Sequence, residues 1–343
     1  MIYRNLTGTG LRVSPYCVGS DSFGANTEPA EALRILARAF EEGVNFIDTA
    51  DSYADGASEE VVGRFIRSRR DEAVVCSKVY HPTGDHPNAL GNGRKHIMAG
   101  VEASLKRLQT DHIDLYLLHY YDYDTPLEES VRAMEDLVQS GKARYAGCSN
   151  FSASQLAKAH WLADKGLNHR FRVNQVRYNL LNREPEIELL PACAELGVSV
   201  VAYSVQAGGM LLGKYFRDAS GAFRSSDPDS RLADSGKERH FYRNAYWNEW
   251  CFKAMEGLTE LAARHGITNS ALAIGWVLAS SQVAACVVGS KSVEQLESNL
   301  ASFSTPIAPE VLEEATAIAD ELLHSGPWRG VVSQPQANAK RED

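Results

Sequence analysis

The chain has 343 residues, of which 44% are hydrophobic and 23% are charged, and its formal net charge is -9. This length and composition suit one large α/β barrel or two ordinary domains, with a sizeable core in either case. The acidic balance argues against binding to nucleic acid, which favours a basic surface. No run of roughly eighteen apolar residues is present to span a bilayer.

Cysteine usage and the first residues predict the compartment. The six cysteines are scattered without a CxxC pair, and Cys76, Cys148 and Cys286 lie in apolar, strand-like runs. Free buried thiols are typical of the reducing cytoplasm, and residues 1–6 lack the apolar core of a signal peptide. We therefore expect a cytoplasmic protein, and we expect no metal site.

Short apolar runs alternate with helical patterns along the whole chain. Residues 6–11 indicate a hairpin turn; their two glycines resemble the start of a dinucleotide fingerprint, but the third glycine and the following helix are missing. The expected strands are 16–19, 44–47, 73–78, 113–119, 143–148, 172–175, 198–204 and 283–288. The expected helices lie near 33–40, 59–66, 97–108, 125–137, from 152, 184–196, 250–265, 270–279, from 292 and 309–322.

Local signals fix some of these helices more closely. Leu33, Leu36, Ala37 and Phe40 share one apolar face of the first helix, and Gly43 ends it. Capping residues are expected at 125–128, where proline would take the first helical position, at 152–155 and at 292–295.

Eight strand-like segments, almost all followed by a helix, favour a single (β/α)8 TIM barrel over an open sheet. We expect one domain over 1–343, with an N-terminal β-hairpin and extra C-terminal helices. A glycine- and charge-rich insertion occupies 207–243, and a polar tail begins at about residue 326.

Candidate catalytic residues stand where three neighbouring strands end. Asp48, Lys78 and His119 close the second, third and fourth strands, and Tyr53 follows just beyond Asp48. Active sites of such barrels lie at the carboxyl ends of the strands. A lysine cation close to a phenol favours the phenolate, so we expect Lys78 to lower the pKa of Tyr53. His119 can orient a carbonyl oxygen through a ring N–H.

Each of these residues also has an ordinary interpretation. A lysine at a strand end is usually a solvated charge, a single histidine is usually a satisfied polar residue, and Asp48 with Tyr53 can belong to a plain loop. The coincidence of all four at one mouth favours the catalytic interpretation.

Five motifs then resemble the aldo-keto reductases. They are 43–53, 76–79 around Lys78, 117–119, 147–151 and 202–204. More narrowly, the chain resembles the branch of bacterial sugar and aldehyde reductases that includes the potassium-channel β-subunits, from Tyr3 to about Leu322. The resemblance implies that Tyr53 is the general acid, that Asp48 and Lys78 tune it, and that His119 positions the substrate carbonyl.

The same resemblance implies an NADPH/NADP+ cofactor bound without a Rossmann domain. Ser149, Asn150 and Gln175 would hold the nicotinamide carboxamide, and Tyr203 would stack on its ring. The remaining implied contacts are Ser20, Asp48, Ser204, Val205, Gln206, Gly208, Lys214, Arg231, Gly289, Ser290, Lys291, Gln295 and Asn299. Lys291, next to a helix N-terminus that suits anions, predicts NADPH over NADH.

Four positions depart from the family pattern. Val205 and Gln206 replace a usual Pro-Leu pair, Ser298 replaces a common glutamate, and Asp21 stands where an apolar pocket residue is frequent. A buried carboxylate there would be costly unless it is paired.

The substrate pocket is expected to be polar. Asp21, Tyr80 and Tyr120 lie just past strand ends, with Tyr121 and Tyr123 close by. Carboxylate and phenol groups suit a small carbonyl substrate that is polar, such as a sugar aldehyde or keto sugar.

The leading hypothesis is an NADPH-dependent reductase of aldehydes or ketones. One alternative is a regulatory β-subunit that uses its bound nucleotide as a redox sensor, and another is a barrel aldolase with Lys78 as the Schiff-base lysine. The sequence specifies neither the physiological substrate nor the oligomeric state.

Overall fold

The computed structural model describes residues 1–166, 169–226, 230, 232 and 237–325. The polar tail predicted from about 326 lies outside these residues. The chain divides into two compact units. The first comprises Met1–Val176, Glu186–Val201 and Gln282–Glu297, and the second comprises Arg177–Pro185, Ala202–Ser281 and the segment from Ser298 onward. A single domain over 1–343 remains a prediction.

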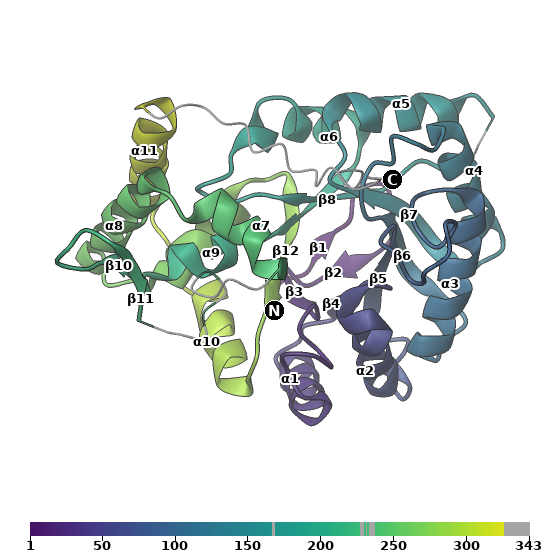
Figure 1. Cartoon of the computed structure of the whole chain (residues 1–343), viewed down its shortest axis with the longest axis horizontal. Helices are drawn as coiled ribbons and strands as arrows, with labels where there is room; N and C mark the ends of the chain where they lie inside the picture. Colours follow the sequence, from purple (N-terminus) through teal and green to yellow (C-terminus); the bar gives the residue numbers. More distant parts are fainter. Residues whose placement is uncertain (167–168, 227–229, 231, 233–236, 326–343) are drawn as a thin grey trace. The chain divides into compact units, whose positions relative to one another are not determined.

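Eight strands form a closed barrel in the order β12-β3-β4-β5-β6-β7-β8-β9 (Figure 1). Their bounds are β3 Tyr16–Gly19, β4 Phe46–Asp48, β5 Val74–Val79, β6 Ile113–Leu118, β7 Ala143–Ser149, β8 Val173–Arg177, β9 Ser199–Tyr203 and β12 Val283–Gly289. The strands from β12 through β3 to β8 pair in parallel. The predicted (β/α)8 barrel is confirmed.

The period of the strands explains both the barrel core and the site above it. Side chains alternate between the two faces of a strand, so Val74, Cys76 and Lys78 of β5 share one face. Val74 and Cys76 belong to the buried apolar cluster inside the barrel, together with Leu115 and Leu117 of β6. The next position of each inward row is polar. The apolar core therefore ends in a polar layer at the carboxyl end of the strands.

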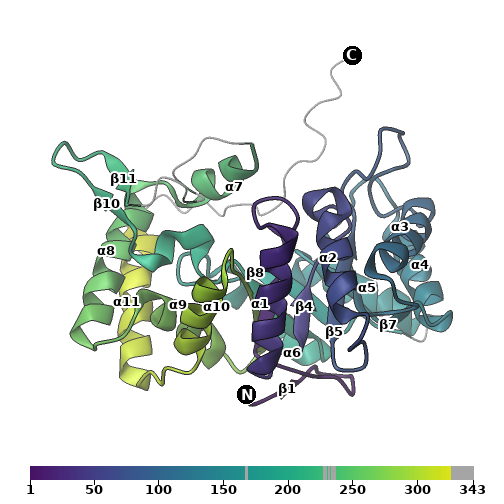
Figure 2. The same cartoon turned by 90° about the horizontal axis from the view of Figure 1, so that it is seen from below.

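Helices cover the outside of the barrel and pack side by side in chain order, as Figures 1 and 2 show. They are α1 Pro29–Glu41, α2 Ala57–Ile66, α3 Arg94–Leu108, α4 Leu127–Gln139, α5 Ala153–Asp164 and α6 Leu189–Leu196. Helix α10, Val293–Phe303, follows β12.

Two predictions about helices need correction. Helix α1 buries Ala32, Ile35, Leu36 and Ala39, so its buried face is centred near Ile35. Phe40 lies at the edge of this face, where it is half-buried and packs edge-on against Phe65 of α2.

The capping box predicted at 125–128 is wrong. Helix α4 begins after Pro126 with no side-chain cap, because the Thr125 hydroxyl donates to Asp122 instead, at 2.7 Å. The box at Ser152 and Gln155 is confirmed.

A two-stranded hairpin closes the amino end of the barrel. It is formed by β1, Arg4–Asn5, and β2, Arg12–Val13. Arg4 donates to the carbonyl of Val283, the first residue of β12, at 2.7 Å. The backbone N–H of Thr7 donates to Ser199, the first residue of β9, at 2.6 Å. The hairpin is therefore attached to the end of the barrel opposite to the polar layer.

The second unit supplies the extra helices. Its elements are η3 Ala207–Leu212, β10 Tyr215–Arg217, β11 Phe223–Ser225, α7 Lys237–Tyr246, α8 Glu249–Arg264, α9 Asn269–Ala279 and α11 Pro309–Ser325. Strands β10 and β11 pair as an antiparallel hairpin, whose Phe223 stacks on Phe252 of α8 at 3.9 Å between ring centroids. Among the described residues, no helix is long and apolar enough to cross a membrane.

Candidate active site

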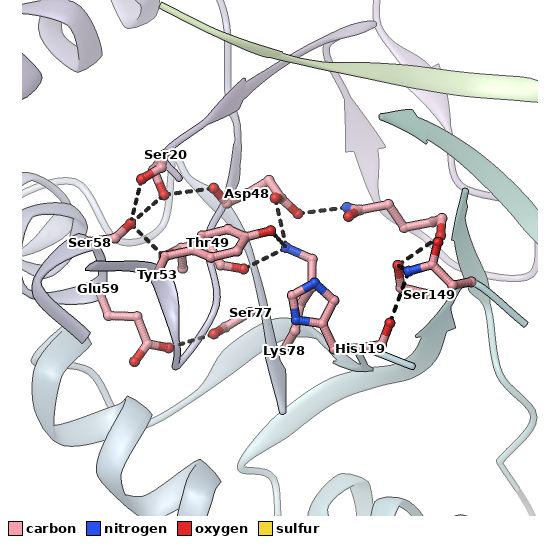
Figure 3. Close-up of polar contacts among 12 residues, drawn as sticks. Ser20, Asp48, Thr49, Tyr53, Ser58, Glu59, Ser77, Lys78, His119 and Ser149 are labelled. Atoms are coloured by element: carbon pink, nitrogen blue, oxygen red, sulfur yellow. Dashed lines mark hydrogen bonds and ion pairs between the residues drawn. The ribbon is translucent and has the colours of Figure 1, made fainter. Parts of the chain in front are cut away.

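The barrel brings the four predicted catalytic residues together at the carboxyl ends of its strands (Figure 3). Asp48 is the last residue of β4, Lys78 is the penultimate residue of β5, and His119 directly follows β6. Tyr53 begins the short 3-10 helix η1, Tyr53–Gly56. The two residues after Tyr53, Ala54 and Asp55, have φ angles of 51° and 52°. That left-handed region is strained for residues other than glycine, and such strain is frequent at functional sites.

The ammonium of Lys78 is the centre of this arrangement. Its side chain is fully buried. Nζ donates to Asp48 Oδ2 at 2.7 Å, to the Thr49 carbonyl at 2.8 Å and to the Tyr53 hydroxyl at 3.1 Å. An ammonium has three donors, so its hydrogen-bonding capacity is filled. Burial alone lowers the pKa of Lys78, but the charge of Asp48 beside it holds that pKa above its ordinary value.

Tyr53 differs from the sequence-based expectation. Lys78 does lower the pKa of its phenol, but burial raises it more, and the net pKa lies above the ordinary value. The phenol therefore keeps its proton at neutral pH. Lys78 stands close enough to stabilise negative charge that develops on the oxygen once the proton has left.

His119 is a neutral imidazole in this site. Burial, with a contribution from Lys78, lowers its pKa well below the ordinary value. Its ring lies 5.8 Å from that of Tyr53, between centroids, at an interplanar angle of 73°. Among the described groups, Nδ1 has no hydrogen-bond partner. A neutral imidazole has one N–H donor, which suits the predicted orientation of a carbonyl oxygen.

Three of the predicted cofactor residues adjoin this site. Gln175 donates to the second oxygen of Asp48 at 2.6 Å, and the Ser149 hydroxyl donates to the Gln175 carbonyl at 2.8 Å. The Asn150 amide donates to the carbonyl of His119 at 3.1 Å, from a backbone with φ of 60°. Hydroxyl and amide groups can match both the donor and the acceptor of a carboxamide. The donor set therefore fits a nicotinamide.

Ser20 has a supporting position. It is fully buried, and its hydroxyl donates to the carbonyl of Asp48 at 2.8 Å and lies 2.7 Å from the Ser58 hydroxyl. Figure 3 shows this pair beside the Asp48 end of β4. The Ser20 hydroxyl therefore fixes the end of β4, the strand that carries Asp48.

The residues after β12 form the start of α10. Gly289 ends the strand, and the buried Ser290 hydroxyl lies 3.4 Å from that of Tyr16. The Lys291 residue is exposed, and its backbone N–H donates to Gln295 Oε1 at 2.8 Å. The predicted cap is confirmed, because the Gln295 N–H donates to Ser292 Oγ at 3.2 Å.

The remaining predicted cofactor residues belong to the second unit. There Gln206 donates to the Ser270 hydroxyl at 2.9 Å and to Asn299 Oδ1 at 3.0 Å. Tyr203 and Lys214 are half-buried. Val205 is buried, and Ser204 and Gly208 have φ angles of 55° and 65°. Arg231 lies outside the described residues.

An aromatic cluster surrounds His119, and one member was missed from the sequence. Tyr120 stacks on His119 at 5.2 Å, and Tyr80 lies 5.6 Å from Tyr120. His81 packs edge-on against His119 at 4.9 Å. The position of His81, two residues past the end of β5, is the sequence feature that could have identified it.

Tyr121 and Tyr123 form a separate cluster with Phe151. Asp21 is exposed, so the desolvation cost expected for this carboxylate does not arise.

A second polar group near the site was also missed. Asp51 is buried, and its oxygens have no hydrogen-bonding side-chain partner among the described residues. It lines a cavity of about 250 Å³ with His96 and Arg107 of α3. Burial, and then the nearby charge of Glu59, raise the pKa of Asp51 to about 8.

Comparison with known proteins agrees with this geometry. Residues 15–320 match the model of the Aldo/keto reductase family. The chain is 36% identical to "Uncharacterized oxidoreductase YrpG" of Bacillus subtilis, over 91% of the chain and 94% of that protein. It is 35% and 34% identical to proteins named "Probable voltage-gated potassium channel subunit beta" in Arabidopsis thaliana and Oryza sativa subsp. japonica. These matches cover 92% and 93% of the chain and 96% of each relative.

The matched region includes all four predicted catalytic residues, Asp48, Tyr53, Lys78 and His119. The chain therefore belongs to the aldo/keto reductase family, and so to the NAD(P)H-dependent oxidoreductases that act on small carbonyl compounds.

Proposed function

We propose that the protein reduces an aldehyde or a ketone to an alcohol with NADPH, and that Tyr53 is the general acid. The observation that carries the proposal is the position of Lys78, whose ammonium bonds both to Asp48, at 2.7 Å, and to the Tyr53 hydroxyl, at 3.1 Å. The proposed acid therefore has a buried cation in direct contact with its hydroxyl oxygen.

The proton transfer follows from this arrangement. Tyr53 begins protonated and donates its proton to the oxygen of the substrate. Lys78 stabilises the phenolate that forms. Its interaction with the Tyr53 oxygen is therefore stronger in the transition state, where negative charge develops, than in the ground state. His119 donates a hydrogen bond that orients the carbonyl. When bound, the cofactor supplies the hydride, and Ser149, Asn150 and Gln175 would hold its carboxamide.

The finer assignments rest on local chemistry. Lys291 supports a preference for NADPH, because its exposed ammonium can pair with an added phosphate. The hydroxyl and imidazole groups of Tyr80, His81 and Tyr120 support a polar carbonyl substrate. The six free cysteines support a place in the reducing cytoplasm.

The test is oxidation of NADPH by the purified chain in the presence of a panel of aldehydes and ketones, polar and apolar. We expect turnover of at least one polar aldehyde and formation of the alcohol. If no carbonyl compound on a broad panel is reduced although NADPH binds, the enzymatic proposal is wrong.

A nucleotide-binding regulatory subunit is the second candidate, because two relatives carry the name of a potassium-channel β-subunit. Such a role would show tight nucleotide binding with negligible turnover on the same panel. The aldolase hypothesis loses support, because the fully buried and fully hydrogen-bonded Lys78 is a poor Schiff-base nucleophile. Borohydride should therefore trap no substrate on it.

A further inference from the structure

The N-terminus of α10 already bonds to side chains of the protein itself. The N–H of Val293, the first residue of the helix, donates to Glu31 Oε1 at 2.9 Å. The N–H of Lys291 donates to Gln295 Oε1. The N–H of Gln295 donates to Ser292 Oγ. Three of the N–H donors that an external anion could use at this helix N-terminus are thus engaged.

Glu31 differs from the other two acceptors because it carries a charge and comes from another helix. It lies in the first turn of α1, and its side chain is 24% exposed. Its second oxygen accepts from Arg34 at 2.6 Å. A carboxylate is favoured at the positive end of a helix dipole. The fold therefore places a negative charge at the helix end where Lys291 would attract a phosphate.

We propose that Glu31 is a specificity-determining residue for the nicotinamide cofactor, whose carboxylate competes with the 2′-phosphate of NADPH for the N-terminus of α10. The inference rests on the proposed function, since it assumes that this end of the barrel binds the nucleotide. Glu31 narrows the preference for NADPH over NADH that Lys291 alone would produce.

The physical argument is a balance of charges at one helix end. A phosphate monoester carries about -1.5 to -2 charges near neutral pH, and it meets the cation of Lys291 but also the anion of Glu31. Arg34 offsets part of the Glu31 charge, although its own side chain is 66% exposed and well screened. NADH has no 2′-phosphate, so its affinity should not respond to the charge of Glu31.

The experiment compares the dissociation constants of NADP+ and NAD+ by calorimetry on the full chain, without turnover. Glu31→Gln keeps an oxygen that can accept from Val293 and removes only the charge. We expect NADP+ to bind about three- to tenfold more tightly and NAD+ to bind as before, given the usual strength of a charge at a helix terminus. The gain should shrink as ionic strength rises.

Two further variants make the result specific. Glu41→Gln removes the same charge from the exposed far end of α1 and should change neither constant. Glu31→Ala also frees the Val293 N–H, so its gain for NADP+ should be at least as large as that of Glu31→Gln. The melting temperature of each variant verifies that it is folded.

The outcomes separate the inference from the proposed function. If both nucleotides bind the wild type but the ratio of their dissociation constants is unchanged in folded Glu31→Gln and Glu31→Ala, Glu31 does not determine specificity. If Glu31→Gln strengthens the binding of NADP+ and NAD+ equally, the Glu31 carboxylate does not act on the 2′-phosphate, and the inference is again wrong. If neither nucleotide binds the wild type, the proposed function itself fails.

Discussion

At the scale of single residues, the site is governed by one buried cation with three acceptors around it. Lys78 fixes the direction of Asp48 and touches the oxygen of Tyr53. The acid does not start as a phenolate, because burial keeps its pKa high. Lys78 stabilises the negative charge that develops on the Tyr53 oxygen during the reaction. Tyr53 supplies the proton, so the two residues have separate roles.

Replacing Tyr53 by phenylalanine should abolish nearly all reduction and leave nucleotide binding intact. Only the transition state needs the transferred proton, and general acid catalysis contributes about 10²- to 10⁴-fold. The measurement is kcat with the best substrate of the panel, together with the Kd of NADP+. A variant that retains most of kcat would show that another group supplies the proton.

Asp51 should make the protein less stable as pH rises from about 4 to 8. Its pKa in the folded chain is about 8, against an ordinary value of 3.8. Between these values the folded state holds a proton that the unfolded state has released, so stability falls by up to about 1.4 kcal/mol per pH unit.

The Asp51→Asn variant removes this penalty and should flatten the pH dependence of urea denaturation. Near pH 8 it should be more stable than the wild type by an amount on the order of 2–4 kcal/mol. The exposed Asp71 offers a control, Asp71→Asn, which should leave the slope unchanged. Equal slopes for wild type and Asp51→Asn would mean that Asp51 is ionised in the folded state.

At the scale of elements, the contact between α2 and α3 depends on one missing side chain. A Cβ on Gly63 of α2 would lie 2.5 Å from the carbonyl oxygen of Arg107 and 2.8 Å from the Cα of Leu108. Both are backbone atoms of the neighbouring segment, so neither can move aside at low cost. The two helices can approach this closely only with glycine at this position.

Gly63→Ala should therefore destabilise the protein by about 2 kcal/mol or more, although alanine is the better helix former by about 1 kcal/mol. Denaturation by urea measures the difference. Gly10→Ala is the matched control, because a Cβ there has nothing within 4 Å, and it should stay within about 0.5 kcal/mol of the wild type. A stabilised Gly63→Ala would show that the helices separate readily.

The sequence predicted elements well where the signal was periodic and less well where it was local. Strand-like segments followed by helices recur eight times along the chain, so the barrel could be predicted. Because Asp48, Lys78 and His119 end three successive segments, their meeting at one end of the barrel could be predicted as well. A capping box was different, because Thr125 can bond either to its helix or to Asp122, and only the folded loop decides.

Long-range contacts limited the prediction of the site. Asp48, Lys78 and His119 stand at or next to strand ends, which the (β/α)8 pattern brings together, and Tyr53 follows β4 by five residues. Glu31 meets Val293 across 262 residues, and no local pattern announces that contact. The high pKa of Tyr53 depends on the degree of burial around it, which the residue types alone do not specify.

At the scale of the whole molecule, the composition contains no sign of the division into two compact units. The chain passes between the units five times, and two of these crossings, Val176–Arg177 and Val201–Ala202, lie inside β8 and β9. No linker or change in composition marks either crossing, so the boundary was not visible in the sequence.

The six cysteines should be nearly inert in the native protein. All are free, and five are buried. Burial raises the pKa even of the half-buried Cys251 to about 12, so little of the reactive thiolate forms. A thiol reagent such as Ellman's reagent should label the native chain slowly. After unfolding in guanidinium chloride, it should label all six thiols. Rapid labelling of the native protein would contradict this burial.

The hairpin at the amino end of the barrel has a consequence for attaching the protein to a surface. The Tyr3 hydroxyl donates to the carbonyl of Gly43, ahead of β4, so the first residues leave the barrel on the hairpin side (Figure 2). A linker placed before Met1 would hold the barrel by its closed end. The mouth that contains Lys78 would then face the solution, which makes this end the natural anchor for a flow reactor or an electrode.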